Sequence, residues 1–142
     1  MVPEINIWAV LLATVSSLVV GSIWYARRMF GNWWIKAAGV SDEQMSSRNP
    51  YPIIVTIIVS FVTALVLAGA AAIAQNFYGG SFLANSLITA LILWAGFTAA
   101  RVITHDAFEG RPKALTLLTI SHELVTVLLM ALIIGLFGIS AT

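Results

Sequence analysis

The sequence predicts an all-α integral membrane protein, a bundle of four transmembrane helices with short interfacial helices in the first cytoplasmic loop. Of its 142 residues, 60% are hydrophobic and only 9% are charged, with a mean hydropathy of +0.97. Soluble domains carry about 25% charged residues, so this composition excludes an ordinary soluble fold. A chain of this length is expected to form one domain, residues 1–142.

Four apolar segments are long enough to cross the hydrocarbon core of a bilayer, which takes about 20 residues of helix. The first ends in Trp24 and Tyr25, followed by Arg27 and Arg28, the order expected of an aromatic belt and its basic anchors. The predicted spans are residues 5–26, 53–74, 82–104 and 114–137.

The connection between the first two spans is too polar to cross the membrane. Asn32 is expected to cap a short helix that carries Trp33 and Trp34, and Gly39 to end it. Paired tryptophans beside a lysine indicate a helix lying at the level of the headgroups. Residues 41–44 read Ser-Asp-Glu-Gln, the pattern of a capping box that opens a second short helix.

The basic residues predict the orientation in the membrane. All seven lie in or next to the first and third connections, namely Arg27, Arg28, Lys36, Arg48, Arg101, Arg111 and Lys113. Short cytoplasmic loops carry the excess of Lys and Arg. We therefore expect loops 27–52 and 105–113 to be cytoplasmic, both termini to be outside, and the protein to be a multi-pass protein of the cell (inner or plasma) membrane.

Short motifs over nearly the whole chain form a recognisable pattern. They are Trp24-Tyr25, Phe30-Gly31, Trp34, Gly39, the run Phe108-Glu109-Gly110-Arg111, Leu124-Val125 and Gly135-Leu136-Phe137. Together they resemble the DUF1761 family of small bacterial membrane proteins, a family of unknown function with four transmembrane helices. The resemblance supports the architecture and implies no activity. In that family an aromatic residue and a histidine precede the Leu-Val pair, whereas His122 and Glu123 stand there in this chain.

The last predicted span carries a polar stripe. Thr116, Thr119, Glu123 and Thr126 share one helical face, with His122 beside it. A carboxyl group deep in a membrane helix costs at least about 2.5–3.5 kcal/mol, so such a group faces protein or a cavity. Glu123 is therefore expected to point into the bundle.

Arg101 is the predicted partner of Glu123. Counted at 1.5 Å per residue, the two residues differ in depth by about 7 Å, within reach of an extended arginine side chain. The polar groups of the cytoplasmic half suggest a pocket that opens to the cytoplasm. The candidate binding residues are Arg101, His122, Glu123, Thr119, Thr98 and Tyr25.

Three functions remain open at this stage. The first is a module that binds or transports a small molecule or ion at this polar site. The second is a structural or assembly protein in which the polar cluster only fixes helix packing. The third is a membrane-embedded enzyme with His122 and Glu123 as acid and base. The sequence favours a non-enzymatic role, because it shows no nucleophile or cofactor motif.

Metal and nucleic-acid chemistry find little support. His122-Glu123 begins a His-Glu-x-x-His pattern, but Thr126 stands in place of the second histidine, and the chain has no cysteine. No metal site, cofactor or nucleic-acid partner is predicted. The expected partners are anionic lipid headgroups at the basic side. A second copy of the chain is also expected, because small residues line the first two spans.

Labelling of single cysteines tests the predicted orientation. Ser47→Cys and Glu109→Cys should resist a membrane-impermeant thiol reagent added to intact cells and should react after the membrane is opened. If either variant reacts with the reagent added from outside, the predicted topology is wrong.

Overall fold

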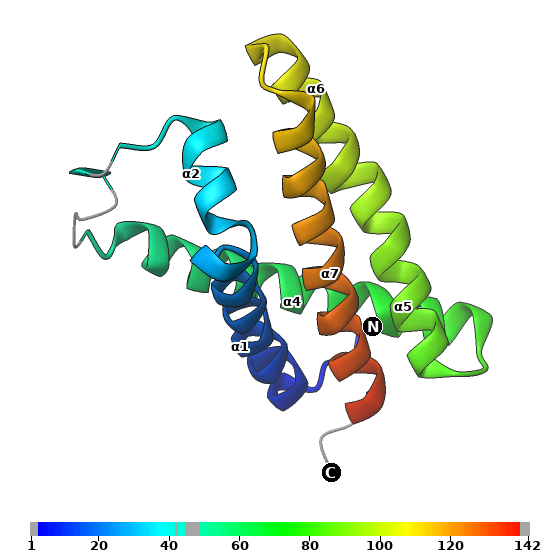
Figure 1. The fold of residues 1–142 in the computed structure, drawn as a ribbon. Helices are drawn as coiled ribbons and strands as arrows, with labels where there is room; N and C mark the ends of the chain where they lie inside the picture. Colours follow the sequence, from blue (N-terminus) through cyan, green and yellow to red (C-terminus); the bar gives the residue numbers. More distant parts are fainter. Residues whose placement is uncertain (1–2, 42, 45–48, 140–142) are drawn as a thin grey trace.

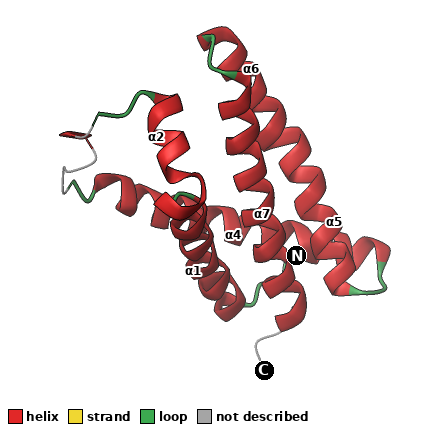
Figure 2. Ribbon diagram, viewed as in Figure 1, coloured by secondary structure: helices red, strands yellow, loops and turns green. Residues whose placement is uncertain are grey.

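The computed structural model describes residues 3–41, 43–44 and 49–139, and this part of the chain contains helices and no strand (Figure 2). Among the described residues, four helical segments are long and apolar enough to cross a membrane: Ile7–Trp24, Tyr51–Tyr78, Phe82–Glu109 and Lys113–Phe137. The predicted all-α architecture with four membrane-length helices is confirmed.

The first helix, α1 (Ile7–Trp24), begins at a side-chain cap. The Asn6 side-chain oxygen accepts hydrogen bonds from the backbone N–H groups of Trp8 at 3.1 Å and Ala9 at 3.4 Å. These bonds satisfy donors that the first turn of a helix leaves free. The start of α1 lies at the same end of the bundle as the end of α7 (Lys113–Phe137), so these two helices run antiparallel (Figure 1).

Small side chains hold the bundle core together. In one buried cluster, Ala9 and Ala13 of α1 meet Ala64 and Ala68 of α4 (Tyr51–Tyr78) and Ala131 of α7. Between membrane helices the packing of small residues is the main source of attraction, because lipid is as apolar as the helices themselves. The alanines therefore fix where α1, α4 and α7 approach one another.

Glycine allows the closest contact between α7 and α5 (Phe82–Leu93). A Cβ atom at Gly135 would lie 2.7 Å from the Cα of Leu83, closer than real Cβ contacts. The two backbones touch there, so any side chain at position 135 would push the helices apart.

Helix α4 is longer than the predicted span 53–74 and lies across the direction of α1 and α7, behind both (Figure 1). Its buried residues run from Ser60 to Ala72, whereas its first nine residues, 51–59, are all exposed. The second half of α4 is thus packed into the bundle, and the first half diverges from it.

The third span consists of α5, a π-helical segment η2 (Trp94–Ala99) and α6 (Ala100–Glu109). The helix continues to Glu109, so the expected loop 105–113 is wrong in its first five residues. Gly110 ends the helix in the left-handed conformation with φ +67°, and α7 starts at Lys113. A glycine is favoured at such a C-terminal position because it has no Cβ to clash.

The first connection contains a tight turn, η1 (Arg27–Gly31), and a short helix, α2 (Asn32–Ala38). The predicted cap at Asn32 is wrong, because Asn32 lies inside the helix and donates to the Arg27 carbonyl at 3.3 Å. The predicted stop at Gly39 is confirmed by its φ of +68°. The predicted helix beyond residue 44 lies partly outside the described residues.

The predicted capping box is present. The Ser41 hydroxyl accepts from the Gln44 backbone N–H at 3.2 Å, and the Gln44 side chain accepts from the Ser41 N–H at 3.0 Å. This reciprocal pair is the geometry that the Ser-Asp-Glu-Gln sequence predicts.

Candidate binding cavity

A cavity of about 690 Å³ lies between α1, α4 and α7. It occupies the space left where the first half of α4 diverges from the other two helices. Pockets that bind small molecules have volumes of about 300–1,000 Å³. The polar residues that line it are Ser17, Ser22, Tyr25, Thr56, Ser60, Thr63, His122, Glu123 and Thr126.

Polar and apolar side chains both line the cavity. Val127 and Met130, two buried residues of the core, line it deep in the bundle. Tyr25 and His122 lie nearer the connection that follows α1, where α4 also begins. Apolar residues therefore line both ends of the cavity, with Ile53 and Val55 of α4 at the end near the connections, and the charged group lies at that same end, as an amphipathic ligand would require.

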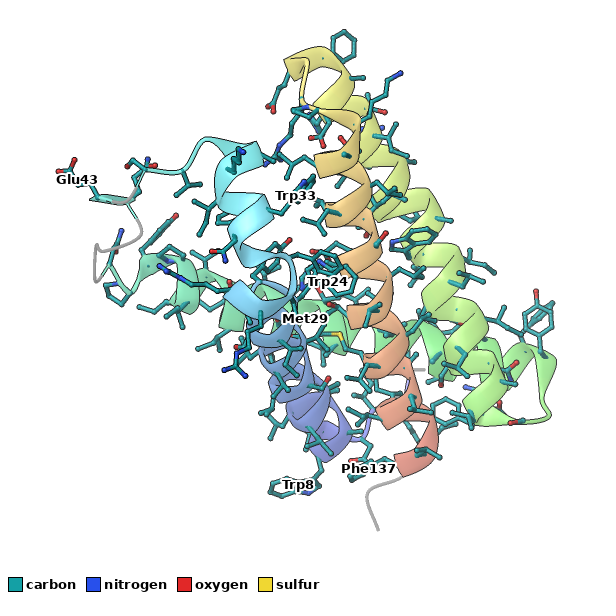
Figure 3. All side chains as sticks on the ribbon, in the orientation of Figure 1. Trp8, Trp24, Met29, Trp33, Glu43 and Phe137 are labelled. Carbon is teal, nitrogen blue, oxygen red and sulfur yellow. The ribbon has the colours of Figure 1, made fainter. Side chains whose placement is uncertain are left out.

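His122 is held at the end near the connections by aromatic side chains. Its ring lies 5.9 Å from that of Trp24 and 5.1 Å from that of Tyr25, between ring centroids. Phe30 packs on Trp24 at 4.9 Å, and Trp34 packs edge-on to Tyr25 at 5.5 Å. Figure 3 shows Trp24 between the turn after α1 and the middle of α7. The aromatic motif of the first connection therefore fixes the position of this imidazole.

Two glycines make this arrangement possible. A Cβ atom at Gly31 would overlap the backbone of Tyr25 and Ala26, so only glycine lets the chain turn back so tightly after α1. At Gly21, a Cβ atom would lie 3.7 Å from the Nε2 atom of His122. The His122 ring is thus packed directly against α1.

Glu123 shares this end of the cavity with His122. The Oε1 atom of Glu123 lies 3.4 Å from the Nδ1 atom of His122, and its side chain is 40% exposed against 14% for His122. Within the described part of the chain, no Lys or Arg lines the cavity. Glu123 therefore brings a carboxyl group to the cavity with His122 beside it and without a lysine or arginine partner among the described lining residues.

Hydroxyl groups of the lining fall into two classes. Those of Ser17, Thr56 and Thr126 donate to backbone carbonyls of their own helices at 2.7–2.9 Å. Such bonds are usual for Ser and Thr in membrane helices. The hydroxyls of Ser60 and Thr63 make no hydrogen bond to the described residues, and both line the cavity. Like the buried Nε2 atom of His122, which also has no partner, they remain available.

The predicted ion pair between Arg101 and Glu123 is wrong. Arg101 is exposed on α6 and pairs with no acidic group of the described chain. The reason lies in η2, because a π-helical turn adds one residue and rotates the helix beyond it by about one residue position. The buried residues of this stretch are Ala99 and Asp106. Each stands one position further along the chain than Thr98 and His105, respectively, so the buried face is shifted by one residue.

Of the six predicted binding residues, the structure places three at the cavity and three elsewhere. Tyr25, His122 and Glu123 line it together. Arg101, Thr98 and Thr119 do not, and the Thr119 hydroxyl donates to the Leu115 carbonyl at 3.1 Å. Ser17, Ser60 and Thr63 also line the cavity and were not among the six predicted residues.

The charged residues of the third connection form a separate cluster. Asp106 is buried and accepts a 2.6 Å hydrogen bond from the Thr116 hydroxyl. The guanidinium of Arg111 lies 3.8 Å from the same carboxylate. This cluster ties the end of α6 to the start of α7. Among the described residues, no three His, Asp or Glu side chains are grouped to hold a metal ion.

A second, smaller cavity of about 420 Å³ lies beside the first turns of α7. Trp24, Phe30 and Trp33 form its aromatic wall, and Ser121 is its one polar lining residue. The indole N–H of Trp24 is buried and makes no hydrogen bond to the described residues. No charged residue of the described chain lines this cavity, in contrast to the one at Glu123.

Comparison with known proteins gives one match. The model of a family described as "Protein of unknown function (DUF1761)" matches residues 8–135. No curated protein and no solved structure matches the chain.

A double-mutant cycle checks the corrected pairing. We expect Arg101→Ala and Glu123→Ala to be additive within about 0.3–0.5 kcal/mol of unfolding free energy, because the side chains share no contact. Asp106→Ala and Thr116→Ala should instead couple by about 0.5–3 kcal/mol, because they remove the same hydrogen bond. Reversible unfolding in detergent measures both cycles. If the coupling energy of Arg101 and Glu123 is as large as that of Asp106 and Thr116, the two side chains do form an ion pair.

Proposed function

This chain belongs to the DUF1761 family, whose function is unknown, and we propose that it is a binding or transport module for a small amphipathic molecule. The ligand enters the cavity between α1, α4 and α7 with its apolar part towards Met130 and its polar part towards His122 and Glu123. This proposal rests on the cavity itself, because neither the family nor any relative supplies an activity.

One observation carries the proposal. The cavity of about 690 Å³ contains unsatisfied polar groups, the Ser60 and Thr63 hydroxyls, beside a carboxyl group. Unlike the hydroxyl of Ser86, neither of these two hydroxyls is fully buried, so both can be reached from the cavity. A ligand or water that completes these bonds accounts for the arrangement.

The charge distribution supports a cytoplasmic entrance. The end of the cavity at Tyr25 and His122 lies towards the first and third connections, and all the basic residues lie in or next to these connections, which the positive-inside rule assigns to the cytoplasm. We propose that both termini lie outside and that Arg27, Arg28 and Lys113 contact anionic headgroups. The exposed residues Ile54, Ile57 and Ile58 of α4, which do not line the cavity, contact lipid or a second copy of the chain, consistent with a homo-oligomer.

Two matched serine-to-cysteine variants test for the cavity. Ser60 and Ser86 are both buried, at 8% and 0% exposure, but only Ser60 lines the cavity. A thiol reacts with a small methanethiosulfonate reagent only as a thiolate in contact with water. In vesicles, we expect Ser60→Cys to react and Ser86→Cys to stay inert. The chain has no native cysteine, so each signal is unambiguous.

A variant that fills the cavity tests whether the reagent reaches position 60 through it. Gly21→Leu places a side chain beside His122 and should slow the reaction of Ser60→Cys. If Ser60→Cys is as inert as Ser86→Cys, the cavity is dry and the binding function is refuted.

A further inference from the structure

We propose that the ligand of this cavity is an organic cation, an ammonium group on an apolar body, with Glu123 as its counter-charge. This inference rests on the proposed binding function and adds the chemical class of the ligand. It follows from the charges of the residues that line the cavity and from the oxygen atoms there that can accept a hydrogen bond.

The first step is charge balance. Glu123 brings the one carboxyl group of the described lining, and no Lys or Arg of the described chain accompanies it. Arg101 is exposed on α6 without an acidic partner, and Arg111 pairs with Asp106. A carboxylate at membrane depth needs a cation or water to offset its desolvation. A positively charged ligand supplies what the described protein does not.

The second step is the geometry of hydrogen bonding. His122 Nδ1 lies 3.4 Å from Glu123, so a proton on Nδ1 points towards this carboxylate and leaves the rest of it free to accept. His122 is thus a positioning residue, itself fixed by Trp24 and Tyr25. The carboxylate can only accept, so the ligand group that bonds it is a donor, and the Ser60 and Thr63 hydroxyls can accept from the same group.

The third step excludes two other classes of charged ligand, metal ions and anions. A bare metal ion needs several oxygen ligands at short distance, and the described lining has one carboxyl group in a cavity of about 690 Å³. An anion would meet the Glu123 carboxylate with no basic side chain to offset it. The apolar side chains of Val127 and Met130 at the inner end instead fit a hydrocarbon or aromatic body.

Two probes of nearly the same shape test the class of ligand. Both 2-phenylethylammonium and the neutral 2-phenylethanol are added to the full chain carrying Ser60→Cys in vesicles. The concentration that half-protects the thiol from a methanethiosulfonate reagent is measured for each. A charge-assisted hydrogen bond is worth about 1.5–3 kcal/mol, so the ammonium should protect at concentrations about 10- to 100-fold lower.

A charge-removing variant assigns the effect to Glu123. Glu123→Gln in the same background should abolish the advantage of the ammonium and leave protection by 2-phenylethanol unchanged. Glu109→Gln removes the same charge at an exposed position outside the cavity and should preserve the advantage.

The outcomes separate the two proposals. A reactive Ser60→Cys with equal protection by both probes, or with none, overturns the cation inference and leaves the cavity in place. An inert Ser60→Cys refutes the binding function and the inference with it. The comparison of the two probes needs only Ser60→Cys, so it decides even if Glu123→Gln does not fold.

Discussion

The close contact of alanines between α1, α4 and α7 is the constraint on which the rest of this structure depends. Ala13, Ala64 and Ala131 are fully buried, and they let the three helices meet at the level of the second half of α4. Packing of small residues acts over short distances only, so it cannot hold α4 where its side chains become larger. From Ser60 towards Tyr51 the helix diverges, and the cavity is the space that results.

The aromatic turn after α1 has a complementary role. Trp24 and Tyr25 end the helix, and the tight turn at Gly31 brings Phe30 and Trp34 back against them. The resulting cluster surrounds His122 of α7 from the side of α1. The sequence predicts Trp24 and Tyr25 as an aromatic belt at the membrane interface. In the structure they also fix the position of the His122 imidazole at the cavity.

The main features of the fold could be predicted from the sequence, because they follow from composition and local pattern. Membrane-length apolar runs, the Gly39 stop and the Ser41–Gln44 capping box all depend on residues close together in the chain. The site could be predicted in part. Polar residues such as His122 and Glu123 stand out in an apolar span.

The remainder depends on geometry that the sequence does not display. The prediction for Arg101 assumed 3.6 residues per turn throughout the third span, and the π-helical segment from Trp94 to Ala99 breaks that period. One extra residue was enough to turn Arg101 away from Glu123 and to bury Asp106 instead. The divergence of α4 is likewise a tertiary property, since residues 51–59 are as apolar as those that follow.

Among the described residues Glu123 has no lysine or arginine as a counter-charge, and the stability of Glu123→Gln is the measurement that decides this point. Asp106→Asn is the comparison, because Asp106 is bonded to Thr116 and paired with Arg111. We expect Glu123→Gln to change the unfolding free energy by at most about 1 kcal/mol, the value of an exposed ion pair, and Asp106→Asn to lower it by more. A loss for Glu123→Gln as large as that for Asp106→Asn would show that the protein itself neutralises Glu123, and would contradict the account.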